Sequence, residues 1–575
     1  MDRVKIVFFC LSLGFILVIG RLFYWQILKT EGLAALAESQ YFSSLTVSAR
    51  RGEILDSDGF PLVANQPSFL AFVQKKDLKI THQALAEQVA PFLTTDSVAT
   101  LSAEEQAQVV AALAKKVQDR LDNPNLAWVP VGRNLSLEKK QALELSAIQG
   151  LDFQESSTRF YPEASMAAQL LGFVGKDDND NNQGYFGLEG FYNLELAGRP
   201  GILRQEKDAL GKPILLGNYY SIPPQNGSSL GLFLDRGLQF MLEEELSAGL
   251  ARYGAKAGSI TLIEPQTGAI LGMVSLPHYS PADYSQSDSE LFKNPVVAET
   301  YEPGSTFKVL VMAAALDAEA VKREDKCDQC EGPRQIGEYT IRTWNEEYHP
   351  DATLDEILQY SDNVGMIFVG EQLGLEPLLT YIKNFGFGNK TGIDLQEETA
   401  SFLRLNNKWG QVGLATLSFG QGIAVTRIQM LAAVSAIANQ GQLMEPHVAA
   451  KVINSQKTIA IEPRTMAQVI KPETAAIVTD MMVNAVNKGE AQWAVPQGYK
   501  IAGKTGTSQI PIAGHYDEEK TITSFIGFAP ADEPRFAMLV TLREPSSSPW
   551  GSETAAPLFF RVAKKLFLYF NIPPE

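Results

Sequence analysis

The sequence has few cysteines, few histidines and a deficit of basic charge. Its 575 residues include three cysteines and five histidines, and 49 lysines and arginines stand against 66 aspartates and glutamates. A formal net charge of -17 repels nucleic acid, so we expect no nucleic-acid partner. Three cysteines cannot build the disulfide framework on which many small exported proteins depend. We expect neither a metal nor a cofactor.

Two of the cysteines form the pair Cys327-x-x-Cys330. A zinc site would need two more ligands, and neither a second C-x-x-C nor a histidine pair accompanies this one. We therefore expect a local disulfide or two free thiols, dispensable for the chemistry of the protein.

Long apolar runs are also scarce, and the single example lies at the N-terminus. Residues 6–20 carry no charge, and apolar character resumes after Arg21 as far as residue 28. A bilayer needs about 20 apolar residues, but Arg21 can extend its charge outward while Tyr24 and Trp25 lie at the interface. The pattern predicts a transmembrane helix over residues 6–28.

Basic residues precede this helix, which sets the expected orientation. Arg3 and Lys5 favour a cytoplasmic tail of residues 1–5, with the rest of the chain on the extracytoplasmic face of a bacterial membrane. A cleaved signal peptide is the alternative, because residues 35–37 (Ala-Leu-Ala) have the form of a cleavage site. That site lies well beyond the apolar region, so we favour an uncleaved anchor.

The length of the chain predicts more than one domain. Residues 29–230 mix short alternating stretches with polar helices and show no catalytic constellation, whereas the texture changes from residue 231 to 575. Residues 259–263 and 269–274 predict a β-hairpin, and residues 501–510, 523–528 and 536–542 predict strands near the C-terminus. Strands at both ends of a helical middle predict an α+β domain with an antiparallel sheet flanked by helices.

Three short motifs in this second part point to chemistry. They are Ser305-Thr306-Phe307-Lys308, Ser361-Asp362-Asn363 and Lys504-Thr505-Gly506-Thr507. In this order they form the S-x-x-K, S-D-N and K-T-G set of penicillin-binding proteins and class A β-lactamases. Because each motif alone is weak, the prediction rests on the set.

The chemistry explains why these residue types recur together. Ser305 and Lys308 lie on one helical face, so a lysine amine with a lowered pKa can accept the serine proton. Ser361 can relay that proton to a leaving amine, and Asn363 offers an amide to a peptide backbone. Lys504 supplies a positive charge that attracts a carboxylate and lowers the pKa of Lys308.

A strand through Thr505, Gly506 and Thr507 can pair with an extended substrate. Two further segments also match the S-x-x-K and K-T-G patterns, but their context does not suit catalysis, and we call them decoys. Ser136-Leu137-Glu138-Lys139 is typical of a helix N-cap, and Lys390-Thr391-Gly392 follows a glycine-rich loop and not a strand.

With these motifs in place, the chain resembles the class B penicillin-binding proteins, with a division-specific character. Residues 51–56, 159–162 and 187–190 are similar to landmarks of the family's non-catalytic pedestal, and residues 301–308, 418–422 and 524–528 to its catalytic half. The chain departs from the family at Ser57, where Arg is usual, at Asp362, where Ser is common, and at Arg427, where Pro is common. We expect neither Asp362 nor Arg427 to touch the proton path.

The resemblance implies a serine D,D-transpeptidase that acylates Ser305 with a peptidoglycan stem peptide ending in D-Ala-D-Ala and binds β-lactams covalently. It also implies work at the septum beside a SEDS-family glycan polymerase and other wall-synthesis membrane proteins. Elongation-type transpeptidation, a β-lactamase, a D,D-carboxypeptidase and a silent scaffold are the alternatives. Class A β-lactamases deacylate with a glutamate, and no Glu-x-x-Leu-Asn segment lies between residues 363 and 406. So few residues follow Thr507 that we expect no appended C-terminal domain.

Overall fold

The computed structural model describes residues 2–94, 98, 101–126, 128–178, 181–206, 214, 219–401, 410–512 and 515–575. The chain forms two compact units. One comprises Met1–Arg51 and Ala197–Gly227, and the other comprises Gly52–Leu196 and Ser228–Glu575.

The first unit begins with the predicted apolar helix. Helix α1 (Arg3–Phe23) continues as the π-helical turn η1 (Tyr24–Leu28), so that Arg3–Leu28 is long and apolar enough to cross a membrane. The Arg21 guanidinium lies 5.1 Å from the Trp25 ring centroid, as expected for a charge held at an aromatic interface. The helix therefore starts a few residues before the predicted span and ends with it.

After α2 (Thr30–Tyr41), this unit forms a three-stranded antiparallel sheet in the order β1-β8-β9. Its strands are β1 (Phe42–Val47), β8 (Gly201–Glu206) and β9 (Tyr219–Ile222).

The second unit contains a long sheet in the order β19-β18-β10-β2-β3-β4, with β5 pairing to β3. Its strands are β2 (Ile54–Leu55), β3 (Pro61–Gln74), β4 (Trp128–Leu135), β5 (Leu151–Phe160), β10 (Ser229–Leu232), β18 (Ala449–Ile453) and β19 (Thr458–Ala460). Three helices add apolar side chains to a separate hydrophobic core on this sheet: α3 (His82–Val89), α4 (Ala103–Asp122) and α5 (Leu137–Leu145). Ser136 caps α5 by accepting a hydrogen bond from the Lys139 N–H, which confirms the helix-cap interpretation of this decoy.

Strand β10 spans the domain boundary expected near residue 230. It pairs in parallel with β2 from the N-terminal part and antiparallel with β18 from the C-terminal part. The two parts therefore share one hydrogen-bonded sheet, and a boundary between residues 29–230 and 231–575 stays a prediction.

A five-stranded sheet, with antiparallel neighbours throughout, organises the C-terminal part in the order β12-β11-β23-β22-β21. Its strands are β11 (Ala257–Ile263), β12 (Ile270–Leu276), β21 (Ala502–Ile512), β22 (His515–Ala529) and β23 (Phe536–Arg543). The predicted hairpin and the three predicted C-terminal strands are confirmed.

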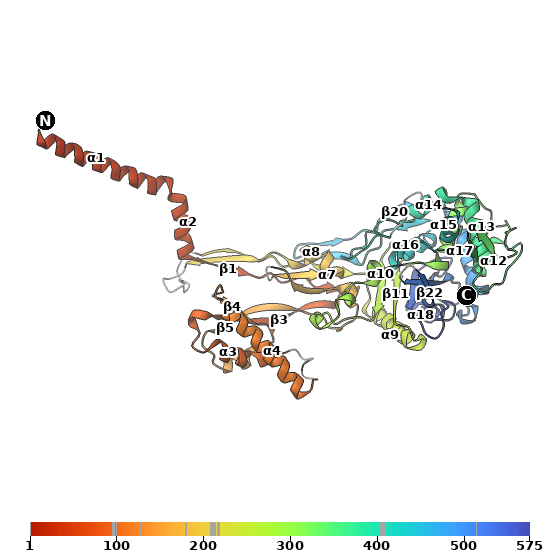
Figure 1. The fold of residues 1–575 in the computed structure, drawn as a ribbon, viewed down its shortest axis with the longest axis horizontal. Coiled ribbons are helices and arrows are strands. Elements are labelled where there is room, and N and C mark those ends of the chain that lie inside the picture. The colour runs from red at the N-terminus through yellow and green to blue at the C-terminus, as the bar shows by residue number, and fades with distance from the viewer. Residues whose placement is uncertain are drawn as a thin grey trace. The chain divides into compact units, whose positions relative to one another are not determined.

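Helices cover both faces of this sheet (Figure 1). Helices α9 (Arg236–Tyr253) and α18 (Ala555–Tyr569) share one core with Phe525 and Val540, whereas the neighbouring Ile526 and Leu539 belong to the other core. That second core contains α11 (Lys308–Asp317), α13 (Asn363–Leu373), α16 (Arg427–Ala438) and α17 (Pro472–Lys488). Alternating side chains of one strand thus serve two helical layers, which confirms the predicted α+β class.

Cys327 and Cys330 form a disulfide, as the local-disulfide interpretation predicted, and both side chains are buried. Among the described residues no group of three or more His, Cys, Asp or Glu side chains is arranged to hold a metal ion.

Candidate active site

The Ser305 motif forms a tight turn at the start of α11. Gly304–Phe307 is the 3-10 helix η7, and α11 begins at Lys308. Residues at i and i+3 eclipse in a 3-10 helix, so Ser305 and Lys308 share one face, as predicted for a helical pair. Ser305 is partly exposed, whereas Lys308 is fully buried.

The loop that contains Gly420 and Gly422 is hydrogen-bonded to this turn. The Gly304 N–H donates to the Gly420 carbonyl at 3.1 Å, and the Gly422 N–H donates to Glu302 Oε1 at 3.1 Å. A Cβ at Gly420 would lie 2.2 Å from the Gly304 carbonyl oxygen, so the close approach requires glycine there. The 418–422 motif therefore supports the nucleophile turn.

The Ser361-Asp362-Asn363 motif precedes α13 and turns sharply. Ser361 has φ 55°, a left-handed conformation that is uncommon for a residue with a Cβ. Asp362 caps α13 by accepting hydrogen bonds from the N–H groups of Val364 and Gly365 at 2.8 and 3.1 Å. The cap fixes the helix end and presents Ser361 and Asn363 to the lysines.

The two predicted lysines meet at Ser361. Lys308 Nζ donates to the Ser361 carbonyl, to Ser361 Oγ at 3.4 Å and to Asn363 Oδ1 at 2.8 Å. Lys504 Nζ donates to Ser361 Oγ at 2.9 Å and to Thr505 Oγ1 at 3.1 Å. In the described part of the chain, no hydrogen bond joins Ser305 Oγ to Lys308 Nζ.

Burial and mutual repulsion shape the ionisation of this pair. Desolvation, followed by the charge of Lys504, holds the pKa of Lys308 well below the ordinary lysine value. Burial lowers the pKa of Lys504 to about 8. Asp362 makes no hydrogen bond to Lys308, but its negative charge raises the pKa of that lysine. The expectation that Asp362 does not touch the proton path stands, because among the described residues its side chain accepts hydrogen bonds only from the N–H groups at the start of α13.

The Lys504-Thr505-Gly506-Thr507 motif lies on β21, the edge strand of the five-stranded sheet. Strand β22 pairs with one side of β21, so the other side is available to an added strand. A Cβ at Gly506 would lie 2.4 Å from Ser524 Oγ and 2.7 Å from Thr306 Cγ2. Glycine at 506 therefore allows β21 to pack directly on the nucleophile turn.

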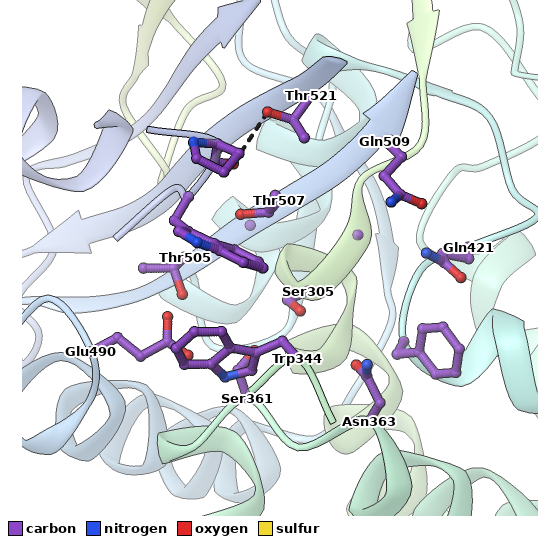
Figure 2. A pocket seen from close by; sticks show the side chains of 15 residues that line it. Ser305, Trp344, Ser361, Asn363, Gln421, Glu490, Thr505, Thr507, Gln509 and Thr521 are labelled. Atoms are coloured by element: carbon purple, nitrogen blue, oxygen red, sulfur yellow. Dashed lines mark hydrogen bonds between the residues drawn. The ribbon is translucent and has the colours of Figure 1, made fainter. Parts of the chain in front are cut away.

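These elements enclose a cleft of about 260 Å³ (Figure 2). The predicted residues Ser305, Ser361, Asn363, Thr505, Gly506 and Thr507 line it. Other lining residues were not predicted as site residues: Trp344, Phe419, Gln421, Glu490, Gln509, Thr521, Pro549 and Trp550. The rings of Trp344 and Trp550 contact each other, with centroids 5.1 Å apart. Trp344, Glu490, Pro549 and Trp550 come from loops that no chemical motif marks, so sequence spacing could not find them.

The second K-T-G match lies elsewhere. The Thr391 N–H and hydroxyl and the Gly392 N–H donate to the Glu398 carboxylate, and residues 389–393 form no strand. Lys390 is not among the residues that line the cleft. The glycine-rich loop interpretation of this decoy is confirmed.

Arg427 has a structural environment away from the lysine pair. Its buried guanidinium donates to the Pro295 carbonyl at 2.8 Å and to Thr541 Oγ1 at 3.1 Å, and it lies over the Tyr301 ring.

In the N-terminal part of the second unit, Arg159 forms a buried ion pair with Glu189 at 2.6 Å.

Comparisons with known proteins agree with this architecture. Residues 258–564 match the penicillin binding protein transpeptidase domain family, and residues 46–232 match the penicillin-binding protein dimerisation domain family. The chain is 35% identical to stage V sporulation protein D of Bacillus subtilis (strain 168), over 98% of this chain and 84% of the relative. It is 26% identical to the peptidoglycan D,D-transpeptidase FtsI of Escherichia coli (strain K12), over 98% of this chain and 91% of the relative.

A solved structure shows the same fold. Penicillin binding protein 2X from Streptococcus thermophilus superposes with a TM-score of 0.71 at 22% identity, covering 92% of this chain and 80% of that one. Three observations assign the family. The two family domains occur in the expected order, a relative is 35% identical along nearly the whole chain, and the three motifs gather around one cleft. The chain belongs to the class B penicillin-binding proteins and is a serine-type D,D-transpeptidase.

Proposed function

We propose that this chain cross-links peptidoglycan stem peptides through an acyl-enzyme on Ser305. The observation that carries the proposal is the position of Ser361 Oγ, which accepts hydrogen bonds from both Lys308 and Lys504 beside the cleft that Ser305 lines. This arrangement supplies a base with a lowered pKa, a hydroxyl that can relay a proton and a second cation for a carboxylate.

In the acylation step, neutral Lys308 takes the Ser305 hydroxyl proton while Oγ attacks the carbonyl carbon of the penultimate D-Ala. The peptide C–N bond breaks, and Ser361 passes the proton to the leaving D-Ala nitrogen. Catalytic hydrogen bonds tighten when substrate binds, so this step does not require a Ser305–Lys308 hydrogen bond before the donor peptide is in place.

The remaining motif residues bind the donor peptide. Lys504 attracts its terminal carboxylate, and the strand Thr505, Gly506 and Thr507 pairs with its extended backbone. Asn363 already uses its Oδ1 with Lys308 and one amide hydrogen with the Arg342 carbonyl. Because the amide carries two hydrogens, one remains for the substrate backbone. A β-lactam that binds in the donor-peptide site acylates Ser305 in the same way.

The membrane helix supports a location on the extracytoplasmic face. Arg3 and Lys5 stand before the apolar segment, which favours residues 1–5 inside the cell and the catalytic part outside. The pedestal of residues 29–230 and the helix are then the surfaces that would meet a SEDS-family polymerase and other wall-synthesis membrane proteins.

Two cellular roles fit the relatives, and depletion separates them. The FtsI relative supports septal wall synthesis, whereas the higher identity to a sporulation protein supports a role in sporulation. Depleted cells that grow long without septa indicate the septal role. Cells that divide normally but form defective spores indicate the second, and round cells that still divide indicate elongation.

The biochemical test uses purified protein and a donor peptide that ends in D-Ala-D-Ala. We expect release of D-Ala and a cross-linked product when an amine acceptor is added, and neither with Ser305→Ala. Lys308→Arg should lower the rate by about 100-fold or more, because arginine keeps the charge but cannot act as a base. Release of D-Ala without cross-links at any acceptor concentration would instead indicate a carboxypeptidase.

A further inference from the structure

One carboxylate, that of Glu490, lines the cleft in the described part of the chain. It follows α17, and its side chain extends toward Thr505 and Ser361 (Figure 2). Glu490 also lines a small adjoining pocket with Lys504 and Thr505. The negative charge therefore lies at the end of the cleft where the K-T-G strand begins.

The backbone around Glu490 is held tightly. A Cβ at Gly489 would lie 2.2 Å from the Ala485 carbonyl oxygen and 3.1 Å from that of Gln359. Gln359 ends α12 (Leu354–Gln359), two residues before Ser361. Ala491, on the other side of Glu490, is buried. The loop thus fixes the Glu490 backbone against the segment that carries Ser361.

Among the described residues the Glu490 carboxylate accepts no hydrogen bond and forms no ion pair, although the side chain is partly buried. Its negative charge partly offsets the lowering of the Lys308 and Lys504 pKa values, in keeping with the small pocket that Glu490 and Lys504 line together. A partly desolvated carboxylate without a partner among the described residues is well suited to bind a cation from solution.

We propose that Glu490 is the acceptor-side binding residue: its carboxylate receives the ammonium group of the incoming acceptor peptide and holds it beside Ser361 for attack on the acyl-enzyme. The proposal rests on the proposed transpeptidase function. The donor carboxylate requires positive charge from Lys504, whereas an ammonium acceptor requires negative charge, and Glu490 supplies it at the end of the cleft that the departing D-Ala vacates.

The proton balance is consistent with this role. An ammonium group arrives with three protons. One leaves to solvent when the amine is freed beside Glu490, and one passes through Lys308 to Ser305 Oγ as the ester C–O bond breaks and the C–N bond forms. The third remains on the new amide. Neither an oxidant nor a cofactor is needed.

The experiment separates the acceptor half-reaction from the donor half-reaction. Full-length protein is acylated with a thioester analogue of the donor peptide. Two acceptors are then compared: a stem tripeptide with a free side-chain ammonium and an amidated C-terminus, and hydroxylamine, which is uncharged at neutral pH. The variants are Glu490→Gln and Glu490→Asp. Glu473→Gln, which changes an exposed carboxylate at the start of α17, is the matched control.

We expect Glu490→Gln to raise the half-saturating concentration of the tripeptide about tenfold, as loss of a partly buried charge pair predicts. Aminolysis by hydroxylamine and labelling by fluorescent penicillin should stay within about twofold to threefold. Glu490→Asp should recover part of the loss, and Glu473→Gln should behave as the wild type.

Several results would overturn the proposal. Unchanged half-saturation by the tripeptide is one, and equal loss with both acceptors is another. Slower hydrolysis with normal aminolysis would instead assign Glu490 to water activation, and loss of penicillin labelling in Glu490→Gln would assign it to the donor side. If wild-type protein fails to label while it remains folded, the proposed function itself is wrong, whatever Glu490 does.

Discussion

At the scale of single residues, the site depends on two buried lysines that contact one serine. Lys308 and Lys504 both donate to Ser361 Oγ, and burial lowers both pKa values. Their tasks need opposite protonation states, because Lys308 must be neutral to accept a proton while Lys504 must be charged to attract a carboxylate. The activity therefore requires the pKa of Lys308 to lie below that of Lys504.

This requirement predicts a bell-shaped pH dependence of penicillin acylation. The rate rises with pH as Lys308 loses its proton, and it falls again near pH 8 as Lys504 does, since the pKa of Lys504 is about 8. Lys504→Arg should keep the acidic limb and lose the alkaline one, because arginine stays charged. Stopped-flow acylation between pH 5 and 10 measures both limbs. An alkaline limb that persists in Lys504→Arg would show that another group causes it.

At the scale of elements, the contact of β21 with the nucleophile turn sets the width of the cleft. Gly506 permits this contact because its missing side chain leaves room for Thr306 and Ser524. The register of β21 on β22 places Gly506 opposite Ser524, so strand pairing and cleft geometry are coupled. A displacement of either element would move Ser305 relative to the substrate strand.

Gly506→Ala tests this coupling. The added Cβ would approach Ser524 Oγ and Thr306 Cγ2 within 3 Å, so we expect a loss of about 1–3 kcal/mol in the free energy of unfolding and at least tenfold slower acylation. Gly332→Ala is the control, because nothing lies within 4 Å of a Cβ at that position. Denaturant unfolding and penicillin labelling measure the two effects. Unchanged acylation in Gly506→Ala would mean that the turn does not depend on this packing.

Sequence patterns predicted the elements of the catalytic part well, for a physical reason. Strands such as β11 and β23 are short apolar runs that are buried on both faces, and the hairpin has a Pro- and Gly-containing turn, so local composition and turn signals suffice. The pairing of β10 with β18 joins segments more than 200 residues apart and has no local signature. Glu490, Trp344 and Trp550 likewise reach the cleft from three separate loops. Only the motif set located the site before its geometry was known.

At the scale of the whole molecule, the apolar helix lies far before the cleft residues in the sequence. The described side chains of Arg3–Leu28 are not buried within the protein. Gly304 is the first residue in the sequence that lines the cleft. Attachment to a membrane and acylation are therefore separable. The helix has the length for a bilayer, since about 20 residues suffice to span it.

Deletion of residues 2–28 should move the protein from the membrane fraction to the soluble fraction of cells. Penicillin labelling of the purified fragment should stay within about twofold of the full-length rate, because deletion leaves the cleft residues intact. Fractionation followed by gel fluorescence measures both. A fragment that stays with membranes would reveal a further membrane contact, and one that is folded but fails to label would show that the helix supports the site.

The most direct test of the account is the mass of the acylated protein and the position of the adduct. Incubation with benzylpenicillin should add one β-lactam per chain, and peptide mapping should place it on Ser305. Ser305→Ala should show no added mass while its thermal unfolding transition is retained, and the decoy variants Ser136→Ala and Lys390→Ala should label as the wild type does. An adduct on any residue other than Ser305, or an adduct that persists in Ser305→Ala, would contradict the account.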